Sequence, residues 1–382
     1  MPQSYAYYPT LPLDLAKTDY LCAQPVYTLH MRFANYIPLL SVTIASCSSP
    51  SAEYDGLSTP NPSAEAVRVY DVLRSSYGSR ILSGTMANVN WNDAEARLVS
   101  DATGRWPAVI GLDFIDISAT DSVSAWDYNP YSDFSVAGDQ WAKGGLVSLC
   151  WHWSVPAAPD SSRLVFRTDT RFRVDSMFAA GSWENKVMNH DLDLVIAQLL
   201  RFRDAGIPVL WRPLHEASGN RKSGGDEWFW WGNGGPDSFV KLWRLIYDRF
   251  QAAGLNNLIW VWTTQTGYGD DQSMGVLSDA DWYPGDEYVD LVGRDAYGRT
   301  AEQLADEFRA ISAAFPRKMA VLSECGDVGK ISEQWELGAR WGLFMPWYTY
   351  KATSLDGHLY ADRQWWQDAM GCDFVVNRGG LW

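Results

Sequence analysis

From about residue 63 onward, the chain alternates between short apolar runs and longer segments whose apolar residues recur on one helical face. One such segment has its apolar side chains three or four residues apart, at Leu192, Val195, Ile196, Leu199 and Leu200. This spacing places them on one side of an α-helix, which can then pack that side against a core. The next segment repeats the pattern at Phe239, Leu242, Trp243, Ile246, Tyr247 and Phe250, and we expect Gly254 to end that helix.

The apolar runs are short and nearly continuous, which is typical of strands buried on both faces of a parallel sheet. Eight of them are expected as strands, at 81–83, 108–113, 146–152, 207–210, 258–262, 289–293, 319–322 and 342–347. The expected helices cover 64–76, 92–103, the two segments described above, 301–314, 333–339 and 362–370. Eight strands alternating with helices predict an α/β fold, a single-domain (β/α)8 TIM barrel over residues 63–382.

Length and composition fit this fold and narrow the possible partners. A chain of 382 residues with 47% hydrophobic content is long enough for a TIM barrel, which needs about 250 residues. The net charge of -15 argues against nucleic acid or an anionic membrane surface as a partner and fits a protein that acts on a neutral polymer. The five cysteines form no spaced framework, so we expect neither a disulfide scaffold nor a zinc site.

The first 62 residues lack this alternation of apolar runs and helical segments. Residues 1–30 are polar and rich in Tyr and Pro, whereas a basic Arg32 precedes an apolar run that ends in Ile44-Ala45-Ser46-Cys47. This ending resembles a bacterial lipobox, and the run is too short to span a bilayer, as expected of a signal peptide. We therefore expect Met31 to be the true start and Cys47 to become the lipidated N-terminus, in the outer membrane of a bacterial cell envelope. The alternative is an unstructured tail with a chance match.

Two boundaries follow from this interpretation. Residues 1–47 are expected to be absent from the mature protein, apart from Cys47 itself, and the Ser/Pro-rich residues 48–62 are expected to form a tether. The mature protein then contacts a membrane only through its lipid, and we expect a monomer.

The chemistry centres on residues 211–216, Trp-Arg-Pro-Leu-His-Glu, which end a buried strand in His215 and Glu216. A carboxylate at such a place is rare unless it is paired or used. Aromatic surroundings would raise the pKa of Glu216, as a general acid near neutral pH requires. The structural alternative is a buried Glu216 in an ion pair with Arg212, with the nearby tryptophans serving only as core.

Other polar and aromatic side chains occur at the ends of the expected strands, where the active site of a TIM barrel lies. They are Asp113, His152, His215, Glu216, Asp295, Tyr297, Glu324 and Trp347. Two of them, Glu216 and Glu324, end strands four and seven and would face the same central cavity. A pair of carboxyl groups is what glycoside hydrolysis needs, because one protonates the leaving oxygen and the other attacks the anomeric carbon.

R-P-L-H-E at 212–216, followed by W-F-W-W-G at 228–232, resembles the signature of glycoside hydrolase family 26, which consists mostly of β-mannanases on TIM barrels. The resemblance implies that Glu216 is the acid/base and Glu324 the nucleophile. It implies that Tyr297 hydrogen-bonds the nucleophile. Arg212 and Asp295 are expected to support the carboxylates, and the role of Asp113 is left open. Sugar contacts are implied for His152, His215, Trp228 and Trp347.

Two features depart from the family pattern. Residues 217–227 form a longer Gly/Ser insertion between the two motifs, which is expected to reshape one side of the cleft. Tyr348 follows Trp347 where some members have an arginine, so contacts to remote sugars cannot be transferred.

The resemblance implies a retaining glycoside hydrolase that cleaves β-1,4-mannosidic bonds in mannan, glucomannan or galactomannan without metal or cofactor. Alternatives are a β-1,3-xylanase or β-1,3-1,4-glucanase of the same family, or a non-catalytic glycan-binding surface lipoprotein. Motifs for zinc peptidases, phosphate loops and dinucleotide binding are absent, as is the G-x-S-x-G of esterases.

Overall fold

The computed structural model describes residues 54–119, 131–219, 228–265 and 280–382. The expected signal region, Cys22, Cys47 and residues 220–227 of the longer loop lie outside these ranges. Within them, no helix combines the length and apolarity needed to cross a membrane.

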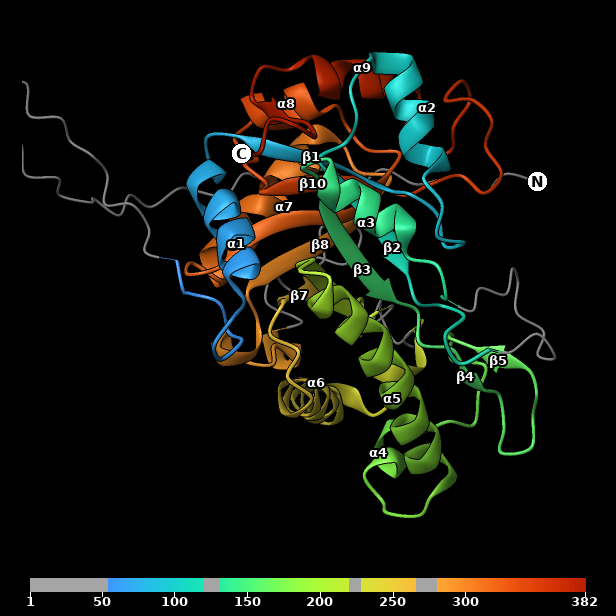
Figure 1. The fold of residues 1–382 in the computed structure, drawn as a ribbon. Helices are drawn as coiled ribbons and strands as arrows, with labels where there is room; N and C mark the ends of the chain where they lie inside the picture. The colour runs from blue at the N-terminus through green and yellow to red at the C-terminus, as the bar shows by residue number, and fades with distance from the viewer. Residues whose placement is uncertain (1–53, 120–130, 220–227, 266–279) are drawn as a thin grey trace, which may run out of the picture. The chain divides into compact units, whose positions relative to one another are not determined.

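Eight parallel strands close into a barrel, because β1 pairs with both β2 and β10 (Figure 1). In chain order they are β1 (Ile81–Met86), β2 (Val109–Asp113), β3 (Leu146–Trp151), β6 (Val209–Pro213), β7 (Leu258–Thr264), β8 (Leu291–Tyr297), β9 (Met319–Gly326) and β10 (Leu343–Pro346). All eight predicted strands are present, and the prediction of a (β/α)8 barrel is confirmed.

Helices lie outside these strands and cover the barrel (Figure 1). They are α1 (Ala64–Ser76), α2 (Ala94–Thr103), α3 (Ser135–Ala142), α4 (Val174–Met177), α5 (Trp183–Asp204), α6 (Gly235–Ala252), α7 (Ala301–Ala314), α8 (Ile331–Glu336) and α9 (Arg363–Gly371). The bounds of α1 and α7 are those predicted. α3 and α4 were not predicted, since both are short and have weak periodicity.

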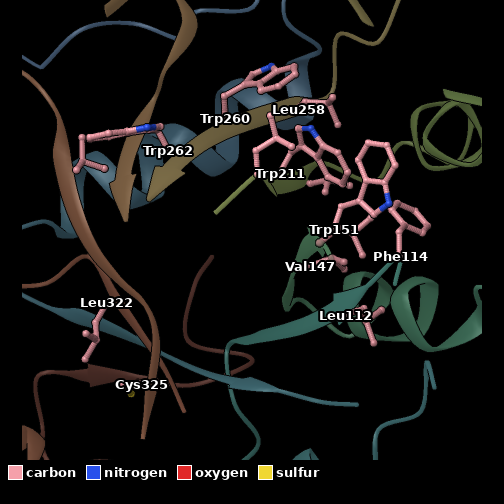
Figure 2. Packing of buried hydrophobic residues seen from close by; sticks show 14 of the residues in the cluster. Leu112, Phe114, Val147, Trp151, Trp211, Leu258, Trp260, Trp262, Leu322 and Cys325 are labelled. Carbon is pink, nitrogen blue, oxygen red and sulfur yellow. The ribbon is translucent and has the colours of Figure 1, made fainter. Parts of the chain in front are cut away.

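The barrel core follows from the two-residue alternation of side chains along a strand. Leu82, Val109, Leu210 and Leu343 belong to one buried cluster, which holds side chains from strand after strand. The intervening residues, including the tryptophans of β6 and β7, pack in a second and larger cluster with the surrounding helices (Figure 2). Many tryptophans therefore serve the core, and only some border the site.

A short strand after α9, β11 (Val375–Val376), pairs with β1 beside β2. The Ser83 hydroxyl of β1 donates to the Val376 carbonyl (3.0 Å) and accepts from the Ala108 backbone N–H (3.0 Å). The end of the chain thus completes the barrel at the N-terminal end of its first strand. Two apolar residues carry too little periodicity to be predicted as a strand.

The expected tether is corrected where the structure describes it. From residue 54 onward, this segment packs on the barrel: the Ser58 backbone N–H donates to Asp290 (2.5 Å), Asp55 pairs with Lys318 (3.0 Å), and Thr59 is buried. Hydrogen bonds and an ion pair hold residues 54–62, so this stretch belongs to the barrel domain. Ser/Pro-rich composition indicates the absence of regular structure, which is not the same as the absence of contacts.

Candidate active site

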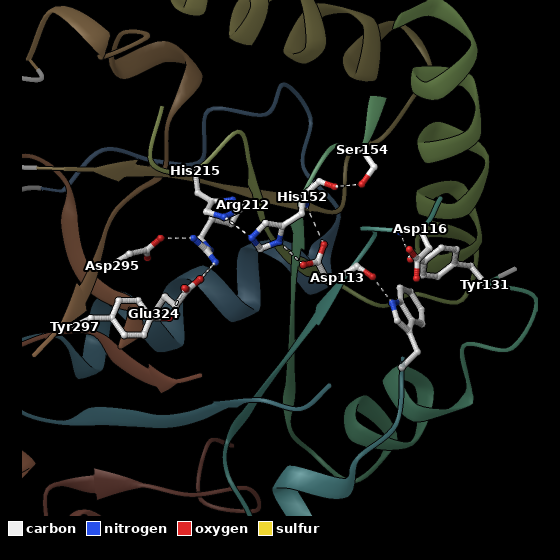
Figure 3. A network of polar contacts seen from close by, with 11 residues as sticks. Asp113, Asp116, Tyr131, His152, Ser154, Arg212, His215, Asp295, Tyr297 and Glu324 are labelled. Atoms are coloured by element: carbon white, nitrogen blue, oxygen red, sulfur yellow. Dashed lines mark hydrogen bonds and ion pairs between the residues drawn. The ribbon is translucent and has the colours of Figure 1, made fainter. Parts of the chain in front are cut away.

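The polar groups predicted at strand ends converge at the C-terminal end of the barrel (Figure 3). Along β6, Leu210 belongs to the inner cluster and Trp211 to the outer one, so the next side chain, Arg212, points back into the barrel. The same alternation explains why Asp295 of β8, two strands along the barrel, faces Arg212.

Glu324 reaches the site because β9 contains a bulge. β9 pairs with β8 through Val321↔Gly293 and then Glu324↔Asp295, which leaves one additional residue on β9. A bulge re-aims side chains, so both Ser323 and Glu324 face the site rather than opposite sides of the sheet. The Ser323 hydroxyl donates to Asp295 (2.7 Å), and Gly293 gives it room, since a Cβ there would lie 2.4 Å from the Ser323 oxygen.

Arg212 is shared between two buried carboxylates. Its Nη1 donates to Asp295 Oδ2 and its Nη2 to Glu324 Oε2, each at 2.6 Å, and all three residues are at most 6% exposed. Burial of an unpaired charge is expensive, so Arg212 compensates the two buried carboxylates that it binds. The alternative in which Arg212 neutralises Glu216 is therefore wrong.

Glu324 has a second donor, because the Tyr297 hydroxyl donates to its Oε1. Burial and the neighbouring Asp295 raise the pKa of Glu324, while Arg212 and the Tyr297 hydrogen bond act in the opposite direction. Donors that bind the anion favour it. Tyr297 itself is 38% exposed, so it is a rim residue rather than part of the core.

Glu216 has a different environment. Its carboxyl group receives no hydrogen bond from the part of the chain that the structure describes, and burial, followed by Asp295 and Glu324, raises its pKa well above the usual range. Its φ of 52° is left-handed, which a glutamate rarely adopts and which costs about 1 kcal/mol or more. Glu216, Asp295 and Glu324 each have one carboxylate oxygen that lies within 4.8 Å of the chosen oxygens of the other two.

Two histidines line the other side of the site. Asp113 Oδ2 lies 2.5 Å from His152 Nδ1, and His152 Nε2 lies 3.1 Å from His215 Nε2. A carboxylate can only accept, so His152 carries its proton on Nδ1. Burial, with Arg212 and His152 nearby, lowers the pKa of His215 well below its ordinary value, so His215 is neutral at neutral pH. Asp113, whose role the sequence left open, thus orients His152.

Aromatic rings surround the histidines. Trp347 lies 5.8 Å from His152 between ring centroids and is partly exposed, and Trp228 is 39% exposed at the start of the 228–232 segment. Sequence analysis missed Phe166 and Phe229, whose rings lie 5.2 and 5.6 Å from that of His152. Phe166 follows β5 (Leu164–Val165), which pairs with β4 (Val155–Pro156), and neither of these two-residue strands was predicted. The apolar triplet 164–166 was the available signal.

Among the residues that the structure describes, two groups have donor atoms close enough for a metal ion: Glu216 with Asp295 and Glu324, and Asp113 with Cys150 and His152. Neither suits one well. Arg212 already supplies positive charge to the first group. Burial raises the pKa of Cys150 well above normal, so its thiol remains protonated and is a poor ligand.

Comparison with known proteins gives a consistent result. The family model "Glycosyl hydrolase family 26" matches residues 58–362. A mannan endo-1,4-β-mannosidase of Thermothelomyces thermophilus is 33% identical over 319 residues, covering 80% of this chain and 60% of the relative. Mannan endo-1,4-β-mannosidase B of Piromyces sp. is 32% identical over 317 residues, covering 78% of this chain and 50% of the relative. The chain thus spans only about half to three-fifths of these relatives.

Solved structures agree. The GH26 domain of an endo-β-mannanase/endo-β-glucanase from Prevotella bryantii superposes with a TM-score of 0.77 at 37% identity, covering 85% of this chain and 98% of that domain. A β-mannanase from a symbiotic protist of the termite Reticulitermes speratus, solved in complex with gluco-manno-oligosaccharide, superposes with a TM-score of 0.72 at 34% identity. The match covers 86% of this chain and 98% of that protein.

Proposed function

Because the chain belongs to glycosyl hydrolase family 26, we propose that it is a retaining glycoside hydrolase that cleaves β-1,4-mannosidic bonds. Mannan, glucomannan or galactomannan is the proposed substrate, since the relatives described above are named mannan endo-1,4-β-mannosidases. Cleavage occurs either within the polymer or by release of mannobiose from an end.

One observation carries the assignment: the two glutamates are close, but only one of them is held by hydrogen-bond donors. Glu324 is held by Arg212 and Tyr297, whereas no described donor binds Glu216. The shared proton therefore resides on Glu216, and Glu324 is the ionised member. One oxygen of Glu216 lies within 4.8 Å of one oxygen of Glu324. This short separation fits double displacement, because inverting enzymes keep their two carboxyl groups about 6.5–9.5 Å apart to admit a water.

The reaction follows from this asymmetry. Glu324 attacks the anomeric carbon while Glu216 gives its proton to the departing glycosidic oxygen, which leaves a glycosyl ester on Glu324 and an ionised Glu216. Glu216 then takes a proton from water, and the resulting hydroxide equivalent attacks the same carbon and releases Glu324. Each carboxyl group ends in its starting protonation state.

Substrate contacts are assigned to the surrounding rings. His152 and His215 offer ring nitrogens for hydrogen bonds to hydroxyl groups of the sugar at the cleavage point. Trp347 provides a flat apolar face beneath that sugar, and the exposed Trp228 provides one for the leaving-group side. The neutral His215 avoids placing a second cation beside Arg212.

A product time course on mannan, mannopentaose, laminarin and xylan tests the proposal, with Glu324→Ala as the inactive control. The proposal is supported if mannan and mannopentaose, but not laminarin or xylan, are cleaved to short manno-oligosaccharides. Turnover of xylan or laminarin instead supports the xylanase or glucanase alternative. Binding of glycan without turnover by the unmodified chain supports a glycan-binding protein.

We also propose that the protein is a lipoprotein of the bacterial outer membrane, anchored through Cys47. The support is the basic and apolar run that ends in Ile44-Ala45-Ser46-Cys47. Mass spectrometry of protein from bacterial membranes should find a lipidated N-terminal Cys47, and Cys47→Ser should abolish acylation. An N-terminus before Met31, or a Cys47 without acyl groups, would contradict this.

A further inference from the structure

The loop between β10 and α9, residues 347–362, lies next to the residue that contacts Glu324. The Tyr360 ring packs edge-on against Tyr297, with 5.6 Å between centroids. The Asp327 backbone N–H donates to the Tyr360 carbonyl (2.7 Å), which ties the loop to the end of β9. At Gly326 an added Cβ would lie 2.4 Å from the Tyr360 ring and 2.7 Å from the Tyr297 ring. The backbone of β9 and both tyrosine rings are therefore in close contact.

A buried histidine anchors this loop. His358 Nδ1 lies 3.2 Å from the Tyr360 backbone nitrogen and 3.1 Å from that of Ala361. Backbone N–H groups can only donate, so Nδ1 accepts from both, while Nε2 lies 3.1 Å from the Thr349 backbone nitrogen. That Nε2 lies 2.6 Å from Glu95 Oε1 on α2, and both side chains are at most 4% exposed.

Tyr297 needs such support because the rest of the barrel does not enclose it. The residue as a whole is 38% exposed, and its hydroxyl makes the hydrogen bond to Glu324. An exposed side chain samples other rotamers unless a neighbour restricts it. Tyr360 is that neighbour, and its position depends on the backbone N–H groups that His358 binds.

We propose that the buried Glu95–His358 pair is a positioning device, which holds Tyr360 against Tyr297 and thereby keeps the Tyr297 hydroxyl on the Glu324 carboxylate. His358 is a positioning residue in this scheme and does not touch substrate. The inference rests on the proposed function in so far as Glu324 is the nucleophile. Other charged or titratable groups facing Glu324 are Arg212, Asp295, Glu216 and His152.

The test compares His358→Gln and Tyr360→Ala with the unmodified chain by 13C NMR, using carboxyl-labelled glutamate and Glu324→Gln for assignment. His358→Gln removes the Nδ1 acceptor, and Tyr360→Ala removes the ring contact. Each should move the Glu324 titration upward, because a loosened Tyr297 stabilises the anion less. Each should also lower kcat/KM on mannopentaose about tenfold, with KM nearly unchanged, as expected for loss of one hydrogen bond to a charged group.

Matched controls are Tyr360→Phe, which keeps the ring, and His190→Gln, which alters a histidine that is 67% exposed and pairs with Asp191 on α5. Neither should move the Glu324 titration. In a Tyr297→Phe background, His358→Gln should add no further shift, because the bond through which it acts is already absent.

Three results would overturn the inference. They are an unchanged Glu324 titration in His358→Gln, a shift of equal size in the His190→Gln control, and a full additional shift in the Tyr297→Phe background. A lower melting temperature without a titration shift would show that His358 has only a structural role. If the unmodified chain hydrolyses no mannan, the proposed function fails, whereas the NMR titration still decides the positioning role.

Discussion

At the residue scale, a single arginine distinguishes the two glutamates. Arg212 binds Glu324 and Asp295 at 2.6 Å each and leaves Glu216 without a described donor. The two carboxyl groups are alike in chemistry, so their roles come from their surroundings. Replacing either glutamate should therefore produce a different defect.

Glu216→Ala should slow the hydrolysis of mannan by about 10²–10⁴-fold, since the leaving oxygen is no longer protonated. An aryl mannoside with a good leaving group should still form the glycosyl-enzyme, which then accumulates because no base activates water. Added azide needs no base, so it should restore turnover and yield a β-glycosyl azide, detected by NMR. Glu324→Ala, the matched variant, should stay inactive or give the α-azide, and the reverse pattern would show the roles exchanged.

Arg212→Met should lower the free energy of unfolding by about 3–5 kcal/mol, because it leaves buried carboxylates without their cation. In this variant the pKa of Glu324 rises further above its unfolded value. An acid with a raised folded pKa contributes stability below the unfolded value and loses it as pH rises through the folded one. The deficit in urea unfolding should therefore grow as pH rises above the folded pKa of Glu324 in the unmodified chain, which itself lies above the unfolded value of about 4.3.

Arg249→Met is the control for Arg212→Met. Arg249 pairs with an Asp193 side chain that is 72% exposed, and Arg249 also donates to Asn189, so its loss leaves no buried charge unpaired and should cost much less than that of Arg212. Equal destabilisation in the two variants, or a deficit for Arg212→Met that shrinks as pH rises, would contradict the account of the buried triad.

At the element scale, an irregular backbone positions the catalytic side chains, whereas regular helix caps contribute to stability. The bulge in β9 brings Ser323 and Glu324 to the same region, and the left-handed φ of Glu216 sets its direction after β6. Strain of this kind persists where the surrounding structure enforces it. The helices, in contrast, carry ordinary capping signals that should affect stability without affecting catalysis.

Thr300 provides a test at this scale. Its side chain accepts from the Gln303 backbone N–H at the start of α7, and the Gln303 side chain accepts from the Thr300 backbone N–H, forming a capping box. Thr300→Ala should lower the free energy of unfolding by about 1 kcal/mol and leave kcat/KM unchanged. Thr300→Ser keeps the hydroxyl and should cost much less in thermal unfolding. Equal losses in Ala and Ser would show that the cap does not contribute.

At the scale of the whole molecule, the barrel is completed by segments distant in sequence. Ser83 near the start of the domain binds the Val376 carbonyl and the Ala108 backbone N–H, while Ser58 and Asp290 attach the segment before α1. These contacts lie at the N-terminal ends of the strands, opposite the catalytic groups. Residues at that end of a TIM barrel contribute to stability rather than to catalysis.

Ser83→Ala should therefore destabilise the barrel without altering the site. The Ala108 N–H would lose its buried acceptor, at a cost of about 1–3 kcal/mol in unfolding free energy. Thermal and urea unfolding measure this loss, and KM and kcat at a temperature well below unfolding should not change. Ser79→Ala, which removes an exposed hydroxyl bonded to the Ser76 carbonyl, should be nearly neutral. Comparable losses in both would argue against the closure role.

Local patterns allowed much of this molecule to be predicted. The periodicity of the helices gave the bounds of α1 and α7 to the residue, because a helix buries one face within each turn and that face appears directly in the sequence. The eight strand runs were recognisable because strands buried on both faces are almost wholly apolar. Glu216 and Glu324 were identifiable because charges at the ends of such runs are unusual.

Only the tertiary structure decided which groups act on one another. Arg212 could have paired with Glu216, four residues away, yet it binds Asp295 and Glu324 from other strands. The β9 bulge, the Phe166 hairpin, the strand β11 and the Glu95–His358 pair likewise depend on register and on contacts between distant segments. Periodicity reports which face of an element is buried, but not which partner covers it, because that choice is settled by the packing of the whole barrel.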